Sequence, residues 1–209
     1  MLADRDEPLG PVRREIVVAL FVDIVGFTRV AERMPLEAVV ATLREFHDPM
    51  TAQIFACGGS VEKYIGDGIF AVFGVPEPSA EDAANALRCA ERMVAAFDVW
   101  NDERKQQGET PLAFGIGLNC GPAVIGDVGS EQSLSFTVIG DTVNTVSQLQ
   151  GAYAPPGHPA GHRRSDRQRH QCGAIAGRGG TPRRACEQGE RSLHGRSAPV
   201  RIWTWLNQR

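Results

Sequence analysis

Long apolar runs are missing from this 209-residue sequence, and none reaches the roughly 18 residues that a membrane-spanning helix needs. The first 15 residues are charged and lack the apolar core of a signal peptide. A strong charge of either sign is missing too. The formal net charge is −3, so the field of the whole chain gives no reason to expect a nucleic-acid or anionic-membrane partner. We therefore expect a cytoplasmic protein with no membrane segment and no nucleic-acid partner.

Paired cysteines are also missing. The five cysteines are widely spaced and form no Cys-x-x-Cys motif, so the sequence indicates neither a zinc site nor a disulfide framework, and we expect reduced thiols. His158, His162, His170 and Cys172 lie near one another in the sequence, but their spacing matches no common metal-site pattern. A solvated loop is the preferred interpretation of that stretch.

Apolar residues make up 42% of the chain, enough for one domain with a hydrophobic core. Their spacing predicts the following order: strand 16–24; helix from Pro35 to Gly58, kinked or frayed at Pro49; strands 61–64 and 69–73; helix 79–100; strands 112–119 and 123–128 around a turn at 120–122; strand 135–139; helix 142–153; strand 200–206. This β-α-β-β-α-β order, with additions, predicts an α+β fold of the ferredoxin-like type, with helices on one face of an antiparallel sheet.

The C-terminal third departs from this pattern. Between positions 155 and 192 the only large aliphatic or aromatic residue is Ile175, so the segment has too little apolar surface to offset its ordering entropy. We expect a polar extension over 1–14, a folded domain over 15–154, an irregular segment over 155–192, and a closing strand within 193–209. The irregular segment resembles translation in a wrong reading frame, which resequencing of the gene would test. A basic arm that binds nucleic acid is less favoured, because aromatic residues for stacking are absent.

Two carboxylates stand where an apolar strand gives way to a glycine-containing turn. Asp23 lies just before Gly26, and Asp67 lies between Gly66 and Gly68. Such carboxylates lie at the rim of a sheet, and two of them can share a pair of Mg²⁺ ions, a common arrangement for moving phosphoryl groups. Either residue alone is more typical of an ordinary turn. Together, with the flanking glycines, they favour a nucleotide site.

Four segments, in the same order, resemble the catalytic domain of class III nucleotidyl cyclases: residues 21–28 (FVDIVGFT), 58–68 (GGSVEKYIGDG), 137–144 (TVIGDTVN) and 194–200 (HGRSAPV). The resemblance covers about residues 15–151 and 193–206. It implies conversion of a nucleoside triphosphate to a 3′,5′-cyclic monophosphate and pyrophosphate. It also implies a head-to-tail homodimer, or a heterodimer with another cyclase chain, in which both protomers contribute to each site.

The resemblance gives the matching residues near the two carboxylates their expected roles. Asp23, Asp67 and the carbonyl of Ile24 would bind two Mg²⁺ or Mn²⁺ ions. Backbone N–H groups of the following loop would hold the phosphates of the nucleotide. The loop residues concerned are Gly26, Phe27 and Thr28.

Two further positions would select the base. Lys63 matches the lysine that selects adenine, because a Lys ammonium can donate to adenine N1, whereas guanine N1 itself carries a hydrogen. A Lys in a strand is otherwise most often a solvent-facing residue. Thr137 matches the second position, where many members carry Asp and where Thr resembles a subgroup that is often bicarbonate-responsive. ATP is therefore the expected substrate.

Asn144 matches the asparagine that orients the ribose. Four residues later the family carries an arginine that stabilises charge on the α-phosphate in the transition state, but this chain has Gln148. Gln can donate a hydrogen bond but has no charge, so we expect a rate lower by roughly 10²–10³. The basic residue that usually holds the triphosphate is best matched by Arg196, beside His194.

Three functions remain open on the sequence alone. The first is an adenylate cyclase, which the residues at positions 23, 63, 67 and 144 favour. The second is a degenerate cyclase-homology domain that binds nucleotide or a partner cyclase without turnover, which Gln148 and the aberrant C-terminal third favour. The third is another ferredoxin-like phosphoryl-transfer domain, such as a polymerase palm or a diguanylate cyclase, although the Gly-Gly-Asp/Glu-Glu-Phe signature of the latter is absent.

Overall fold

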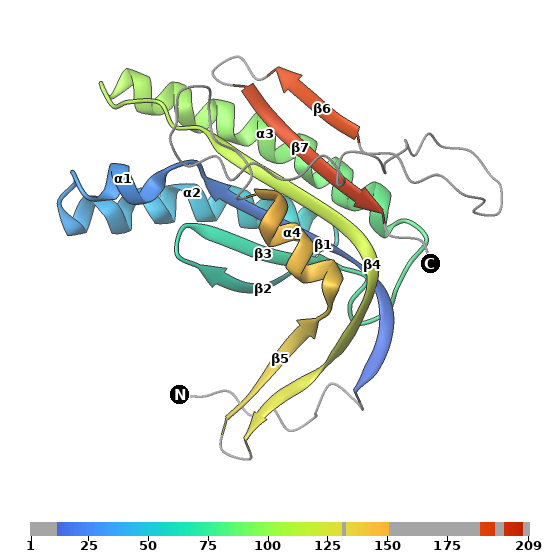
Figure 1. Cartoon of the computed structure of the whole chain (residues 1–209). Helices are drawn as coiled ribbons and strands as arrows, with labels where there is room; N and C mark the ends of the chain where they lie inside the picture. Colours follow the sequence, from blue (N-terminus) through green and yellow to red (C-terminus); the bar gives the residue numbers. More distant parts are fainter. Residues whose placement is uncertain (1–11, 131–132, 151–188, 195–198, 207–209) are drawn as a thin grey trace, which may run out of the picture.

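The computed structural model describes residues 12–130, 133–150, 189–194 and 199–206. Its elements, in chain order, are β1 (Arg13–Ile24), α1 (Phe27–Ala31), α2 (Leu36–Ala56), β2 (Ser60–Ile65), β3 (Gly68–Phe73), α3 (Asp82–Gln106), β4 (Phe114–Ser130), β5 (Ser133–Ile139), α4 (Asp141–Gln150), β6 (Gly189–His194) and β7 (Pro199–Leu206). Figure 1 shows them in one view.

All seven of these strands form one sheet, in the order β2-β3-β1-β4-β7-β6, with β5 paired to β4. Within it, β4, β1, β3 and β2 are neighbours in that order and all antiparallel. This is the ferredoxin-like arrangement, since β1 and β2 flank β3 while β3 and β4 flank β1. The predicted α+β ferredoxin-like fold is therefore confirmed. The structure adds a parallel pair, because β7 joins the far edge of β4 in parallel before β6 closes the sheet.

Helices cover both faces of this sheet. Along β1, Val18 and Leu20 pack into one apolar cluster with α2 and α3, whereas Val17 and Ala19 pack into a second cluster with Val146 of α4. This alternation follows from the two-residue period of a strand. Figure 1 shows α4 in front of β1 and β3, with α2 and α3 on the far side of the sheet. The predicted placement on one face thus holds for α2 and α3, and α4 lies on the other.

The predicted turn at residues 120–122 is wrong, because β4 continues through it as one strand of 17 residues. On one side, residues 114–125 of β4 pair with β1. On the other side, the partner changes from β7 (at residues 116–120) to β5 (at residues 124–130). Pro122 falls in the gap between these two partners. A proline is tolerated where no ladder hydrogen bond needs its missing N–H, so Gly121-Pro122 marks a change of partner and not a turn.

Helix α2 runs through Pro49 and ends at Ala56, so it does not end early there. Phe46 lies before the proline, and Met50 and Ile54 follow it; all three are fully buried in the core. Burial on both sides of Pro49 keeps the helix continuous despite the lost backbone hydrogen bond. As predicted, the glycines at 58 and 59 follow directly, and the Gly59 N–H donates to the Ile54 carbonyl at 2.9 Å.

Helix α3 starts three residues after the predicted position and extends six residues beyond the predicted end. The N-cap is Glu81, without a side-chain capping hydrogen bond, and not Ser79 as the sequence predicts. Ser79 makes two hydrogen bonds just before the helix. Its hydroxyl accepts a hydrogen bond from the Glu81 N–H (3.2 Å), and its own N–H donates to the Asp82 carboxylate (2.6 Å). At the far end, Asn101 and Arg104 are buried and bind the chain that follows, which holds the last turns in place.

The C-terminal strands show one further difference from the prediction. The closing strand is confirmed as β7, but β6 begins at Gly189, inside the stretch predicted to be irregular, and pairs with β7 as an antiparallel hairpin. Residues 155–188, which carry the reading-frame hypothesis and the His/Cys group, lie outside the described residues, as do residues 1–11.

Candidate active site

The fold brings the two predicted carboxylates together. Asp23 is the last residue but one of β1, and Asp67 lies in the two-residue loop between β2 and β3. Since β3 pairs with β1, that loop folds back beside the end of β1. The Ile24 N–H donates to Oδ2 of Asp67 at 3.0 Å, which fixes the Asp67 carboxylate against the strand end.

Gly68 makes this close approach possible. A Cβ atom on Gly68 would lie 2.6 Å from the Phe21 ring of β1, far inside van der Waals contact. Phe21 is itself buried, so it has little room to move. The glycine that follows Asp67 is therefore required for the loop to approach β1, and with it the carboxylate.

The two carboxylates are partly buried and repel each other. Burial, and secondly repulsion by Asp67, raise the pKa of Asp23 from 3.8 to about 8. Burial also raises the pKa of Asp67, although hydrogen bonds from the Ile24 N–H and from its own N–H, and then His47, oppose the rise. A divalent cation would replace this repulsion by attraction.

Asp23, Asp67 and the Ile24 carbonyl are the groups that could hold Mg²⁺ or Mn²⁺ here. In the ranges that the structure describes, no group of three or more His, Cys, Asp or Glu side chains could hold a metal ion. Mg²⁺ commonly binds through one or two carboxylates and completes its coordination with water and substrate phosphates. Asp23 and Asp67 with the Ile24 carbonyl match that pattern, whereas a structural zinc site would need more side-chain ligands.

His47 is a neighbour of this pair that sequence reasoning missed. It lies on α2, with its Nε2 atom 3.1 Å from the carbonyl oxygen of Asp67 and its ring 4.9 Å from that of Tyr64. A single His in an amphipathic helix carries no sequence signal of this role, because the contact joins residues 20 positions apart.

A turn at Val25 and Gly26 follows the end of β1, with Gly26 exposed and Val25 half-buried. Gly26 has φ +70°, a conformation that favours glycine, and α1 begins directly after it. Phe27 turns its ring into the core, which leaves Thr28 exposed at the surface. The phosphate-binding role of this loop stays a prediction.

The base-selecting candidates lie on two different strands. Lys63 is opposite Phe70 of β3, whose side chain lies in the cluster on the α4 face, so Lys63 belongs to that face of the sheet. Thr137 alternates along β5 with Phe136 and Val138, which pack into the same cluster, so Thr137 lies on the other side of the β4–β5 pair. The Thr137 hydroxyl donates to the Ser135 carbonyl at 3.3 Å.

The residues predicted to contact the ribose and the phosphates are Asn144, Gln148 and Arg196. Val143 and Val146 face the sheet from α4, whereas Asn144 is exposed on the outer side of that helix. Gln148 comes one helical turn after Asn144 on α4. Arg196 lies outside the described residues.

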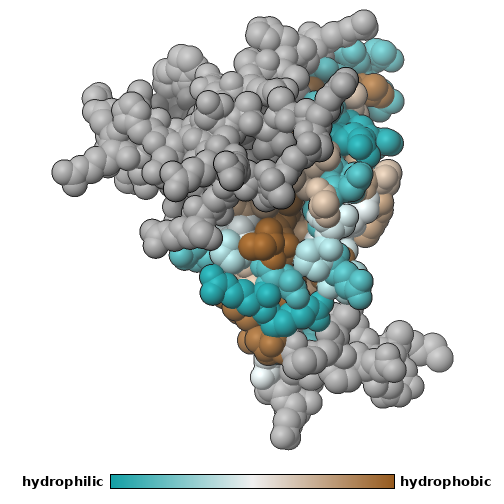
Figure 2. Space-filling model, turned by 90° about the vertical axis from the view of Figure 1, so that its right-hand side faces the viewer, coloured by the Kyte–Doolittle hydropathy of each residue, from teal (hydrophilic) through white to brown (hydrophobic). Residues whose placement is uncertain are grey.

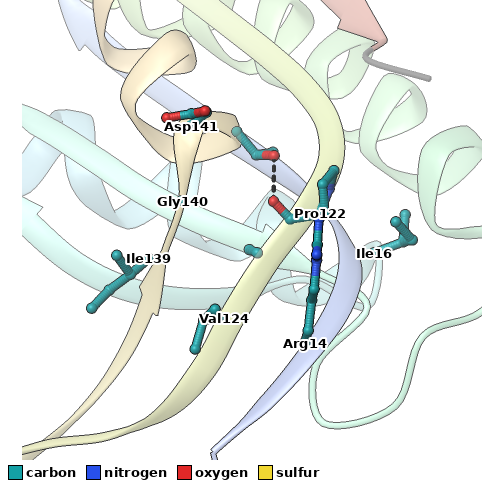
Figure 3. A pocket seen from close by; sticks show the side chains of 9 residues that line it. Arg14, Ile16, Pro122, Val124, Ile139, Gly140 and Asp141 are labelled. Carbon is teal, nitrogen blue, oxygen red and sulfur yellow. Dashed lines mark hydrogen bonds between the residues drawn. The ribbon is translucent and has the colours of Figure 1, made fainter. Parts of the chain in front are cut away.

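A cleft of about 750 Å³ lies at the bend of the sheet, and none of the predicted site residues lines it. Ile16, Val124 and Ile139 enter it from three strands, and Arg14 extends beside them (Figure 3). These three apolar side chains are between 41% and 56% exposed. Figure 2 views the molecule from the right-hand side of Figure 1. Below the grey atoms it shows brown apolar residues next to teal polar ones. The cleft is thus separate from the carboxylate pair.

Two hydrogen bonds fix the start of α4, the helix of Asn144. The Thr142 hydroxyl donates to the Pro122 carbonyl at 2.8 Å, the contact drawn as a dashed line in Figure 3. The amide of Asn119, which is buried on β4, donates to the Thr142 carbonyl at 2.8 Å. Sequence reasoning missed both contacts, because each joins segments about 20 positions apart.

The ferredoxin-like sheet, with one carboxylate at the end of β1 and another in the β2–β3 loop, agrees with the resemblance of the sequence to class III nucleotidyl cyclases. Comparison with known proteins agrees. The sequence model of the adenylate and guanylate cyclase catalytic domain matches residues 11–155, more than half of the chain. The chain therefore belongs to the adenylate and guanylate cyclase catalytic domain family.

Individual relatives include both kinds of cyclase. Adenylate cyclase 1 of Rhizobium meliloti is 34% identical over 138 residues, which are 66% of this chain but only 21% of that protein. The crystal structure of the guanylyl cyclase Cya2 superposes with a TM-score of 0.64 at 33% identity, over 68% of this chain and 72% of that one. The adenylyl cyclase CyaB from P. aeruginosa superposes with a TM-score of 0.66 at 29% identity, over 68% and 74%. The chain thus spans about a fifth of the Rhizobium protein.

Among the described residues, no helix is both long enough and apolar enough to cross a membrane.

Proposed function

We propose that this domain is an adenylate cyclase, which converts ATP to 3′,5′-cyclic AMP and pyrophosphate by attack of the ribose 3′-hydroxyl on the α-phosphate. The observation that carries the proposal is the juxtaposition of Asp23 and Asp67, fixed by the Ile24 N–H and held in mutual repulsion that a divalent cation would relieve. Family membership supports the cyclase chemistry.

Different residues of the chain would bind the metal ions, the phosphates and the ribose. Asp23, Asp67 and the Ile24 carbonyl would hold two Mg²⁺ or Mn²⁺ ions, which lower the pKa of a ribose hydroxyl and neutralise phosphate charge when bound. The loop from Gly26 to Thr28 would present backbone N–H groups to the phosphates. Asn144 would orient the ribose through hydrogen bonds, and Arg196 would hold the triphosphate chain.

The choice of base rests on Lys63 and Thr137. The relatives do not decide it, because they include both adenylyl and guanylyl cyclases. The Lys63 ammonium supplies donors only, which suits the unprotonated N1 of adenine and opposes the N1–H of guanine. The Thr137 hydroxyl can accept a hydrogen bond from the exocyclic amine of adenine.

A dimer is part of the proposal. Asn144 is exposed on the side of α4 that faces away from its own sheet. A residue placed in this way can act on a nucleotide held by the carboxylates of a second chain. This supports a head-to-tail homodimer, or a heterodimer with another cyclase chain, in which each site takes residues from both protomers.

A second candidate function is a cyclase-homology domain that binds nucleotide or a partner chain without turnover. Gln148 favours it, because it stands one turn after Asn144, where the family carries an arginine. Loss of that charge removes transition-state stabilisation and leaves metal and substrate binding intact.

One assay separates these two functions. Purified protein is incubated with ATP and Mn²⁺, and cyclic AMP is measured for the wild type and for Gln148→Arg. We expect Gln148→Arg to be faster than the wild type by roughly 10²–10³. The matched control Gln148→Lys adds charge without the planar guanidinium and should recover much less.

The other outcomes distinguish the candidates. If both proteins are silent but bind ATP and dimerise, the binding module is the correct function. If GTP is converted in preference to ATP, the assignment of Lys63 is wrong. Asp67→Asn in the Gln148→Arg background should abolish turnover, and retained activity would exclude the carboxylate pair as the metal site.

A further inference from the structure

The Lys63 ammonium is held by the Glu62 carboxylate, and the position of Glu62 depends on a β-bulge in β2. The pairing of β2 with β3 shifts between Val61 and Lys63, so Glu62 is the extra residue of a β-bulge. In a regular strand, adjacent side chains point to opposite faces and cannot meet. Here the Lys63 Nζ atom lies 3.0 Å from Oε1 of Glu62, so the bulge brings both charges to the same side.

The two members of this ion pair differ sharply in burial. The Glu62 side chain is 1% exposed, whereas that of Lys63 is 47% exposed. The second oxygen of Glu62, Oε2, is also buried and accepts no hydrogen bond from the residues that the structure describes. A buried carboxylate is costly without a compensating charge, so the Lys63 ammonium is strongly held at Oε1.

This arrangement leaves the ammonium available to a ligand. An ammonium has three N–H donors, and Glu62 engages one of them on the buried side. The remaining donors belong to the half-exposed end of Lys63. A lysine otherwise has a long flexible stem, and fixing its charge in advance removes the entropic cost of ordering it when a base binds.

We infer that Glu62 is a positioning residue for base selection: by holding the Lys63 ammonium in one place, it sets the preference of this chain for adenine over guanine nucleotides. Glu62 does not touch the base itself, since its carboxylate is buried behind Lys63. The inference rests on the proposed ATP site. It adds the residue that makes Lys63 selective, because a mobile ammonium could swing away from guanine N1–H and discriminate less.

The test measures binding and not turnover, so the effect of Gln148 does not enter. The dissociation constants of 3′-deoxy-ATP and 3′-deoxy-GTP, which lack the attacking hydroxyl, are measured by calorimetry with Mn²⁺. We expect Glu62→Gln to reduce the adenine preference about tenfold, mainly through weaker binding of 3′-deoxy-ATP. Glu45→Gln is the matched control. It removes a carboxylate that accepts from the Trp100 indole at 3.3 Å. Trp100 packs on the α2–α3 side of the sheet, whereas Lys63 lies on the α4 side, so the preference should stay unchanged.

A double-mutant cycle identifies action through Lys63. Lys63→Met should lose the preference, and Glu62→Gln should then change it no further. An equal effect of Glu62→Gln in both backgrounds would overturn the inference, because Glu62 would then act without Lys63. Glu62→Asp keeps the charge and should retain most of the preference. A loss as complete as that of Glu62→Gln would show that packing, and not charge, matters.

The remaining outcomes separate this inference from the proposed function. A wild-type preference for 3′-deoxy-ATP that survives Glu62→Gln with unchanged thermal stability overturns the inference alone. A wild-type chain that binds both analogues equally overturns the proposed substrate, and the inference with it.

Discussion

Asp23 couples the stability of the metal-free protein to pH. Because its pKa in the folded state is raised from 3.8 to about 8, the folded protein keeps a proton that the unfolded chain has already lost. The unfolded chain therefore binds fewer protons between these two values, and stability falls as pH rises. Asp67 acts in the same direction, since its pKa is also raised.

We predict that the melting temperature of the metal-free wild type falls by several degrees between about pH 5 and pH 8, and that Asp23→Asn flattens this dependence. Millimolar Mn²⁺ should restore stability to the wild type at the upper pH and not to Asp23→Asn. Differential scanning calorimetry measures both effects. Asp48→Asn, at an exposed position on α2, is the control. A rise of melting temperature with pH in the wild type would contradict the prediction.

Cys89 should be unreactive in the folded protein. Burial, with the neighbouring Cys57 thiol as the next cause, raises the pKa of Cys89 to about 12, and its side chain is fully buried. The thiolate is the reactive form, so both its population and its access are low.

The measurement uses a thiol-specific disulfide reagent on a variant in which Cys172 and Cys186 are replaced by serine. We expect Cys57 and Cys89 to stay unmodified in the folded state at about pH 8, with Cys120 the faster of the three, and all to react after denaturation. Rapid modification of Cys89 in the native protein would show that the core opens there.

At the scale of single residues, the sequence identifies a candidate site residue when the signal comes from its immediate neighbours in the chain. Asp23 and Asp67 stand out in the sequence because Asp23 lies near the end of an apolar strand, three residues before Gly26, and Asp67 lies between two glycines. Glu62, His47 and Asn119 do not stand out in this way. The contact of Glu62 depends on a bulge, and those of His47 and Asn119 depend on which distant elements become neighbours. Such contacts are properties of the fold and leave no periodic signal in the chain.

Helix α4 depends on its attachment to β4. The hydroxyl of Thr142, which is buried, donates to the Pro122 carbonyl, so Thr142→Val would leave that carbonyl without this donor. We predict a loss of about 1–2 kcal/mol in unfolding free energy, measured by urea denaturation. Amide hydrogens in the first turn of α4 should also exchange faster.

Thr145→Val is the matched control, since Thr145 is on the same helix and is only partly buried. It should change stability little. If Thr142→Val and Thr145→Val behaved alike, the hydrogen bond to Pro122 would not be what fixes the helix.

Element order and type could be predicted because they follow from local periodicity, and the ferredoxin-like arrangement of β1 to β4 is confirmed. The failures have a common physical origin. Gly121-Pro122 has the composition of a turn, but twelve consecutive residues of β4 pair with β1 and override that local preference. The placement of α4 could not be predicted either, since an apolar stripe such as Val143 and Val146 says only that a helix is covered, not by which face of the sheet.

At the scale of the whole molecule, the proposed head-to-tail dimer predicts complementation between two inactive chains. Asp67→Asn damages the metal site, and Asn144→Ala damages the ribose contact that the partner would receive. In a mixture, one of the two sites of each heterodimer collects both defects, and the other is intact. We predict that mixing equal amounts restores about a quarter of full activity, because about half of the dimers are then heterodimers.

The assay follows cyclic AMP after the two chains are unfolded and refolded together, with Gln148→Arg in both if the wild type is slow. Each variant refolded alone is the control. Absence of recovery in a mixture that does dimerise would show that each chain holds a complete site by itself.

The change of partner along β4 bears on how the protein forms during synthesis. The edge that β7 covers, residues 116–120 of β4, belongs to a strand in the middle of the chain, whereas β7 comes at residues 199–206. The ferredoxin-like core can therefore assemble while this edge still shows unpaired N–H and C=O groups to other chains. If synthesis stalls or a protease cuts before β7, the remaining chain would expose this unpaired strand edge and would be prone to aggregate. Strand β7 therefore protects the newly synthesised protein against aggregation.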